Sequence, residues 1–374
     1  LSQKMAGDVA AVQQMFDRLL QASFDQAKRE LEELTELATQ QGHTGSLAQW
    51  DIPYWAERLR EQRFSFTDEQ LRPYFSLDRV LDGLFGLTER LFGMRVRRSA
   101  DAVSVWDPDV RYYEVLNEQG QQIAGFFLDP YSRPHNKRPG AWMNDCIGRS
   151  VSDCGIRLPV AHLICNSTPP SGGKPALMTF REVETLFHEF GHGLHHMLTQ
   201  VNERDVSGIS GVEWDAVELP SQFMENFCWE WQVVEGMTGH VDTGQPLPRA
   251  LFDKMLAARN YQSGLATLRQ VEFALFDMRL HAEPRKAADA SHIQRVLDEV
   301  RDEVSVVPTP EFNRFQHAFS HIFAGGYAAG YYSYKWAEVL SADAFEAFEE
   351  TGVLNPQTGL RYRREVLEAG GSRP

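Results

Sequence analysis

Three residues near the middle of the chain have the types and the spacing to bind a metal ion. His188, Glu189 and His192 form the pattern H-E-x-x-H. Residues four apart lie on the same face of a helix, so the two imidazoles can reach one ion. A zinc ion with an open coordination position generates hydroxide near neutral pH, and Glu189 can accept the released proton. The pattern therefore predicts a peptidase that uses one Zn²⁺ ion per chain.

The residues around this pattern indicate that it lies on a helix. Thr179 and Glu182 have the spacing of a capping box. Apolar residues then recur at helical spacing: Phe180, Val183, Leu186, Phe187, Phe190 and Leu194. Gly191 and Gly193 each cost about 1 kcal/mol relative to Ala inside a helix, which indicates that a neighbouring element approaches closely. We expect His195 to lie outside the ligand set, at the surface or in support of a ligand.

A second predicted helix supplies candidates for a third metal ligand. Three aromatic residues recur at helical spacing there: Phe223, Phe227 and Trp231. Pro220 is tolerated in the first turn of a helix, so the helix begins near Glu218. A zinc site with two histidines takes one carboxylate from a neighbouring helix. By chemistry alone, Glu213, Glu218 and Glu225 all qualify.

A tyrosine-rich stretch near the C-terminus has the groups that could stabilise a transition state. The pair Gly325–Gly326 allows a loop to which a peptide backbone can come close. Tyr327, Tyr331 and Tyr334 are spaced as on one face of a helix. Their hydroxyls can donate hydrogen bonds to an oxyanion, which commonly contributes several kcal/mol to catalysis. The alternative is an aromatic stripe that faces a core, the usual meaning of such spacing.

Together these stretches resemble the thimet oligopeptidase, neurolysin, oligopeptidase A and dipeptidyl carboxypeptidase family of zinc peptidases. Within this family, the motif sequences are most similar to those of the bacterial oligopeptidase A branch. In that family the glutamate of V-E-x-P-S-Q is the third zinc ligand, and this chain reads V-E-L-P-S-Q with Glu218 at that position. The resemblance also matches Glu184, four residues before His188, to a carboxylate that orients an imidazole.

The same resemblance implies roles for the C-terminal stretch. Six positions separate His321 from Tyr327, the spacing of the dipeptidyl carboxypeptidase and oligopeptidase A members. His321 and Tyr331 would stabilise the tetrahedral intermediate. Tyr327 and Tyr334 would hold the substrate, which would lie against Gly325–Gly326.

Composition limits the partners and the compartment. The formal net charge is −15, which argues against nucleic acid or an anionic membrane surface as a main partner. The 43% hydrophobic content is enough for a large core, yet there is no apolar run of about 18 residues and no signal peptide. The four cysteines lack metal-ligand spacing and are expected to be reduced thiols. We expect a cytoplasmic monomer without membrane contact.

The predicted fold is mainly α, a multi-helix zincin-type catalytic domain with a small β-sheet next to the zinc helix. Residues 1–100 form a helical subregion that begins with a helix pair in residues 1–40. Residues 101–175 form the β patch, with a hairpin that turns near Gly120. Residues 176–374 carry the zinc site and the substrate loop. The strand over 160–166 either pairs with an extended substrate or lies inside the sheet.

The resemblance covers the whole chain but only the catalytic part of family members, whose N-terminal helical wall we expect to be missing here. It implies a metalloendopeptidase that hydrolyses short oligopeptides, with Glu189 as the general base. Two other interpretations remain. Without the wall, the chain would be a catalytically silent zinc-binding fragment. If H-E-x-x-H is accidental, the chain is a helical scaffold that binds no zinc.

Overall fold

The computed structural model describes residues 6–282 and 290–373. Contacts divide the chain into two compact units, and each combines two stretches of sequence. Unit 1 contains Leu1–Phe66 and Asp253–Trp336, and unit 2 contains Thr67–Phe252 and Ala337–Pro374. These units do not coincide with the three consecutive subregions predicted from the sequence, because segments from the first and third subregions pack together in each unit.

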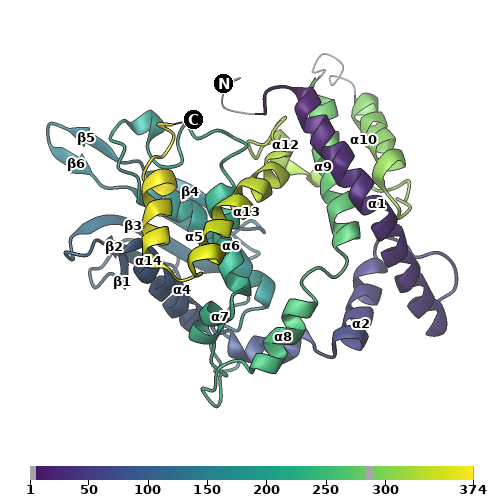
Figure 1. The fold of residues 1–374 in the computed structure, drawn as a ribbon, viewed down its shortest axis with the longest axis horizontal. Coiled ribbons are helices and arrows are strands. Elements are labelled where there is room, and N and C mark those ends of the chain that lie inside the picture. Colours follow the sequence, from purple (N-terminus) through teal and green to yellow (C-terminus); the bar gives the residue numbers. More distant parts are fainter. Residues whose placement is uncertain (1–5, 283–289, 374) are drawn as a thin grey trace. The chain divides into compact units, whose positions relative to one another are not determined.

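Unit 1 is built from helices whose apolar faces meet in two buried clusters, one around Phe16 and Phe276 and the other around Leu34 and Trp55. Its helices are α1 (Val9–Gln40), α2 (Ile52–Phe64), α9 (Ser263–Ala282), α10 (Ala290–Val304), α11 (Phe315–Ala318) and α12 (Ser320–Phe323). Helix α1 lies along α9 (Figure 1). The predicted helix pair in residues 1–40 is wrong for residues 9–40, which form one helix, because no glycine or proline interrupts them.

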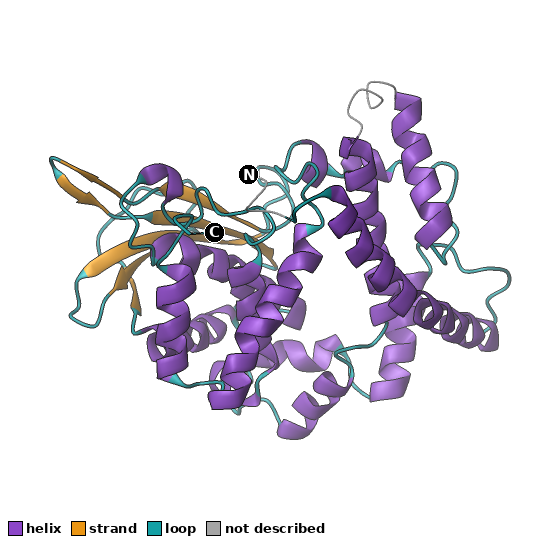
Figure 2. Ribbon diagram, turned by 45° about the horizontal axis from the view of Figure 1, so that its top comes forward, coloured by secondary structure: helices purple, strands orange, loops and turns teal. Residues whose placement is uncertain are grey.

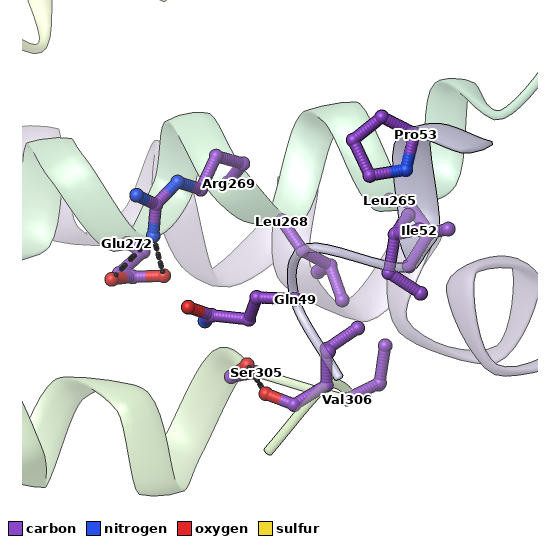
Figure 3. Close-up of a pocket in the computed structure, with 10 residues that line it drawn as sticks. Gln49, Ile52, Pro53, Leu265, Leu268, Arg269, Glu272, Ser305 and Val306 are labelled. Carbon is purple, nitrogen blue, oxygen red and sulfur yellow. Dashed lines mark hydrogen bonds and ion pairs between the residues drawn. The ribbon is translucent and has the colours of Figure 1, made fainter. Parts of the chain in front are cut away.

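A buried ion network joins α9 and α10. Glu272 is 4% exposed and accepts hydrogen bonds from Nη1 of Arg269 at 2.8 Å and from Nε of Arg301 at 2.9 Å. This pairing offsets the cost of burying a carboxylate. A cavity of about 380 Å³ lies beside Arg269 and Glu272, with Leu265 and Leu268 in its apolar wall (Figure 3). Its lining is separate from the predicted metal-binding and catalytic residues.

Unit 2 contains a five-stranded mixed sheet in the order β1-β2-β3-β7-β4. The strands are β1 (Arg95–Arg98), β2 (Arg111–Leu116), β3 (Gln122–Tyr131), β7 (Val160–Ser167) and β4 (Trp142–Ile147). The β3–β7 pair is parallel and the other pairs are antiparallel. Strands β5 (Ser150–Ser152) and β6 (Gly155–Arg157) form a separate two-stranded sheet. The predicted hairpin is confirmed: β2 and β3 are joined by a turn in which Gly120 has φ 78°.

The strand that precedes the motif helix lies inside the sheet. Strand β7 pairs with β3 on one side and with β4 on the other. Both of its edges are therefore occupied, so the prediction that it pairs with a substrate backbone is wrong and the alternative, a strand within the sheet, is confirmed.

The helices of unit 2 pack beside this sheet (Figure 2). They are α3 (Asp68–Leu71), α4 (Leu77–Phe92), α5 (Phe180–Met197), α6 (Leu219–Asn226), α7 (Trp231–Met237) and α14 (Pro356–Tyr362), with single turns at Arg72–Tyr74, Arg204–Val206, Phe227–Trp229 and Arg363–Leu367. Helices α8 (Arg249–Ala257) and α13 (Ser333–Thr351) include the unit boundaries. The predicted mainly-α fold with a small sheet beside the motif helix is confirmed.

Helix α5 packs on the sheet through its apolar face. The rings of Phe190 and Phe126 meet edge to face at 5.6 Å, and a side chain at Gly193 would touch Leu163. Within the described residues, no helix is both long and apolar enough to span a membrane.

Candidate active site

The helix that carries H-E-x-x-H begins as the sequence predicts. Oγ1 of Thr179 accepts the backbone N–H of Glu182 at 3.2 Å, and Oε2 of Glu182 accepts the backbone N–H of Thr179 at 2.7 Å. This capping box satisfies two N–H groups that a helix start leaves unpaired. The helix then continues unbroken through the motif to Met197.

Gly191 allows α6 to cross α5 at close range. A Cβ atom at this position would lie 2.3 Å from the carbonyl oxygen of Pro220 and 2.6 Å from Cα of Ser221. Only glycine lets the two backbones approach this closely, as the sequence predicted. The crossing places Glu218, the residue just before α6, next to the two histidines.

His188, His192 and Glu218 form a cluster that could hold a metal ion. Oε2 of Glu218 lies 3.3 Å from Nε2 of His188 and 3.2 Å from Nε2 of His192. The three ligand atoms lie within 4.8 Å of one another. Two imidazole nitrogens and one carboxylate oxygen are a donor set that suits zinc in a catalytic site. Of the three glutamates that chemistry alone left open, Glu218 is the one in this cluster.

Glu225 supports the cluster, a role that the sequence reasoning missed. Its Oε1 lies 2.5 Å from Nδ1 of His188. The signal was available, because Glu225 follows Glu218 by seven residues and two helical turns return a side chain to the same face. Glu184, the carboxylate predicted to orient an imidazole, accepts a hydrogen bond from Nε1 of Trp229 at 2.8 Å. Its role toward a histidine stays a prediction.

The electrostatics of the cluster favour a cation. Burial opposes protonation of His188, but hydrogen bonds with Glu218 and Glu225 outweigh it and raise the pKa of His188 well above its usual value. Burial alone would raise the pKa of Glu218, yet His192 and His188 hold that pKa well below its usual range. Glu218 faces both imidazoles and Glu225 faces one of them, so this excess of negative charge suits a divalent cation.

Glu189 is buried beside the cluster without being part of it. Its side chain is 5% exposed, and within the described residues its Oε2 is buried without a hydrogen-bond partner. Burial raises the pKa of Glu189, although His188 and His192 counteract the effect. A buried unpaired carboxylate oxygen is uncommon and calls for a water molecule or a ligand. Together with the donor set, this atom fits a metal-activated water.

The two histidines after the motif do not belong to the cluster. His195 is 4% exposed, and burial lowers its pKa to about 3, with smaller contributions from His192 and His196. Of the two expectations for His195, a surface position is therefore wrong. Nε2 of His196 lies 2.9 Å from the carbonyl oxygen of Ile147 on β4. This contact ties the end of α5 to the edge of the sheet.

The tyrosine-rich stretch belongs to unit 1 and is not the helix that its spacing suggests. Residues 327–332 form turns between α12 and α13. Gly326 has φ 90° and Ala329 has φ 54°, both in the left-handed region, which interrupts a right-handed helix. Gly325 is needed for packing, since a Cβ atom there would lie 2.8 Å from Cα of His321.

The aromatic side chains of this stretch nevertheless gather in one cluster. The rings of Tyr327 and Tyr334 stack at 5.1 Å, and the ring of Tyr331 lies 5.0 Å from that of Tyr334. The ring of His321 lies 6.0 Å from both Tyr327 and Tyr331. The hydroxyl of Tyr331 donates to Oε1 of Gln270 on α9 at 3.1 Å. The residues that the sequence groups therefore lie together, although not on the single helix that their spacing suggests.

Comparisons with known proteins give the chain its family. The family model described as Peptidase family M3 matches residues 1–374. Oligopeptidase A of Escherichia coli (strain K12) is 51% identical over 373 residues, which are 100% of this chain and 54% of the relative. The organellar oligopeptidase A of Arabidopsis thaliana, chloroplastic/mitochondrial, is 48% identical and covers 100% of this chain and 48% of its own. The dipeptidyl carboxypeptidase of Escherichia coli (strain K12) is 33% identical over 100% of this chain and 54% of its own.

The chain spans about half the length of the curated relatives it matches. The similarity nevertheless extends over all of the described structure, including the motif helix and the helix that follows Glu218. The match of the family model to every residue confirms the resemblance drawn from the motifs: the chain belongs to peptidase family M3.

Proposed function

We propose that this chain is the catalytic region of a zinc metalloendopeptidase that hydrolyses peptide bonds in short oligopeptides. The cluster of His188, His192 and Glu218 carries the proposal, together with the unpaired oxygen of Glu189 beside it. Membership of peptidase family M3 and the high identity to oligopeptidase A support this class of reaction.

His188, His192 and Glu218 would hold one Zn²⁺ ion. When bound, zinc supplies Lewis acidity, which lowers the pKa of water and polarises the scissile carbonyl. The protein must present both imidazoles as neutral ligands. Glu225 serves this purpose at His188, because an Nδ1–H that donates to Glu225 leaves the lone pair of Nε2 for the metal.

Glu189 would act as the general base and then as the general acid. Its carboxylate takes a proton from the attacking water and delivers it to the leaving amine. The raised pKa of Glu189 suits this sequence, because burial makes the carboxylate hold the proton between the two steps. General acid–base catalysis of this kind typically contributes about 10²–10⁴-fold to the rate.

The aromatic cluster of unit 1 would supply donors for the oxyanion. We assign this role to His321 and Tyr331, and the binding of substrate to Tyr327, Tyr334 and Gly325–Gly326. The family motif supports the assignment, as does the gathering of the four rings. A preorganised donor at a developing oxyanion is worth about 10²–10³ in kcat.

The proposed partners are short peptides, without nucleic acid or membrane, and the proposed state is a cytoplasmic monomer. The net charge of −15 supports the exclusion of nucleic acid. One relative from Arabidopsis thaliana is named a probable cytosolic oligopeptidase A, which favours the cytoplasm, although another from the same organism is organellar.

The substitution Glu189→Gln tests the mechanism. It should leave one zinc ion per chain and lower kcat on a quenched oligopeptide about 10²–10⁴-fold, because the base is lost and the ligands are kept. Zinc is measured by elemental analysis, and chelator should abolish the activity of the unaltered protein. The matched control is Glu203→Gln, an exposed glutamate that should change neither quantity.

Two results would contradict the proposal. Turnover that survives Glu189→Gln in purified protein would remove Glu189 as the base. Zinc bound without turnover in the unaltered chain would instead favour the silent zinc-binding interpretation.

A further inference from the structure

A fully buried carboxylate lies outside the candidate metal site, on helix α9 of unit 1. Asp277 is 0% exposed. Its Oδ1 accepts the backbone N–H of Ala329 at 2.9 Å and lies 2.8 Å from Nδ1 of His281, while its Oδ2 accepts the backbone N–H of Tyr331 at 2.8 Å. Burial raises the pKa of Asp277, and the N–H groups of Tyr331 and Ala329 together with His281 counteract this. Both oxygens of this buried carboxylate thus accept hydrogen bonds from residues 327–332, here called the tyrosine loop.

The tyrosine loop needs such an anchor because it has little regular structure of its own. Residues 327–332 form turns, and Ala329 has φ 54°, which L residues disfavour. Such a backbone persists only when its surroundings fix it. The two backbone N–H groups that donate to Asp277 belong to Ala329 and Tyr331, the residues on either side of Gly330. The carboxylate therefore fixes the backbone that leads into Tyr331.

Helix α9 also holds the side chain of Tyr331. Gln270 lies seven residues before Asp277, two turns along the same helical face. Its Oε1 accepts the hydroxyl of Tyr331 at 3.1 Å. The ring of Phe273 meets that of Tyr331 edge to face at 5.7 Å. Backbone, ring and hydroxyl of Tyr331 are all fixed by one helix.

We propose that Asp277 is a positioning residue that, paired with His281, holds the tyrosine loop and the ring of Tyr331 in place, so that the hydroxyl of Tyr331 need only turn from Gln270 to an oxyanion to act as its donor. The catalytic part of this inference rests on the proposed function of Tyr331, whereas the anchoring of the loop does not. The sequence offers no reason to single out Asp277, because an aspartate inside a predicted helix is ordinarily exposed to solvent.

The first experiment measures the anchor without using activity. Asp277→Asn keeps the size of the side chain, but its amide NH₂ group would face a backbone N–H in place of an acceptor. Hydrogen exchange of peptides that cover residues 327–334 should become about tenfold faster, while exchange in α5 stays unchanged. Asp302→Asn, an exposed aspartate on α10, is the control and should leave both unchanged. Unchanged exchange at 327–334 in folded Asp277→Asn would overturn the proposal.

If Asp277→Asn does not fold, His281→Gln provides the same test with a smaller perturbation of the fold. It removes the imidazole that neighbours Oδ1 of Asp277 and leaves the carboxylate in place. The exchange of residues 327–334 should again increase, by less than in Asp277→Asn. Exchange that equals that of the unaltered protein would likewise overturn the anchor.

The second experiment is a double-mutant cycle on kcat in the zinc-loaded enzyme. Tyr331→Phe and Asp277→Asn should each lower kcat by about tenfold or more, with little change in KM or in zinc content, and the double variant should resemble Tyr331→Phe alone. Full multiplication of the two losses would show that Asp277 does not act through Tyr331. Unchanged kcat in Tyr331→Phe would remove the proposed role of Tyr331, and the exchange experiment would still decide whether Asp277 anchors the loop.

Discussion

At the scale of single residues, the contact between His188 and Glu225 links metal binding to a side chain outside the ligand set. A neutral imidazole carries one N–H, and the 2.5 Å contact of Nδ1 with Glu225 assigns that proton to Nδ1. The lone pair of Nε2 then faces Glu218, where the metal would bind. Glu225 also adds negative charge beside a cation site.

The substitution Glu225→Gln should weaken zinc binding about 10–100-fold, the usual effect of losing a partner that orients a ligating histidine. A neutral amide can still contact Nδ1, but it no longer favours donation from that nitrogen, and it removes one negative charge. Competition with a chelating indicator of known affinity measures the change. Glu235→Gln, on the exposed side of α7, is the matched control. Equal zinc affinity in the two variants would show that Glu225 has no part in holding the metal.

At the scale of elements, the crossing of α5 and α6 decides whether the third ligand reaches the histidines. Gly191 is the point of closest approach, and Glu218 immediately precedes α6. Any separation of the two helices therefore moves Glu218 away from His188 and His192.

The substitution Gly191→Ala should destabilise unit 2 although alanine favours helices. The added Cβ would lie 2.3 Å from the carbonyl oxygen of Pro220, and such overpacking typically costs about 1–3 kcal/mol. The free energy of unfolding and the zinc affinity should both fall. Gly86→Ala is the control, since Gly86 lies on an exposed face of α4 with open space at its Cβ, where alanine should stabilise by up to about 1 kcal/mol. Equal effects of the two substitutions on stability would contradict the close approach.

A structural feature can be predicted from the sequence when the residues that determine it are neighbours in the chain. The capping box at Thr179, the motif helix and the turn at Gly120 are fixed by neighbouring residues, and all three predictions are confirmed. The prediction of a helix through the tyrosine-rich stretch is wrong. The tyrosines have helical spacing, but Gly326 and Ala329 take left-handed conformations that the tertiary structure imposes. Asp277 carried no local signal for its contact with the tyrosine loop, since the backbone N–H groups of Ala329 and Tyr331 lie about fifty residues further along the chain.

The choice of Glu218 shows the same limit at the candidate site. Chemistry alone left three glutamates open, and family resemblance selected one. The structure places Glu218 in the cluster through the crossing of two helices, a contact between positions about thirty residues apart. No periodicity within either helix specifies where the other one crosses.

At the scale of the whole molecule, the chain doubles back so that each unit combines two distant stretches. In unit 1, α1 packs along α9 although more than two hundred residues separate them. The residues of the candidate metal cluster lie in unit 2, and the tyrosine loop lies in unit 1.

The stability of the metal-free chain should depend on pH in a way that zinc reverses. His188 has a raised pKa, so its contribution to stability is complete below its unfolded-state pKa of about 6.5 and is lost as the pH rises through the raised value. Glu218 has a lowered pKa, so its contribution is complete above about pH 4.3 and is lost as the pH falls through the lowered value. The raised pKa of Glu189 makes its ionisation destabilising as the pH rises. His188 and Glu218 together therefore favour the metal-free fold most between about pH 4.3 and 6.5, and Glu189 shifts the optimum toward the lower end of this range.

Zinc binding opposes this trend, because His188 must release its proton to become a ligand. Zinc affinity should therefore increase up to about tenfold per pH unit, for one released proton, until the pH exceeds the raised pKa of His188. The difference in the midpoint of thermal unfolding between zinc-loaded and chelator-treated protein should be small at about pH 5.5 and larger at about pH 8, since bound ligand stabilises according to its affinity. His188→Ala should remove most of this difference at every pH. A zinc-induced shift of equal size at both pH values would mean that His188 does not exchange a proton for the metal, and the assignment of His188 as a ligand would then fail.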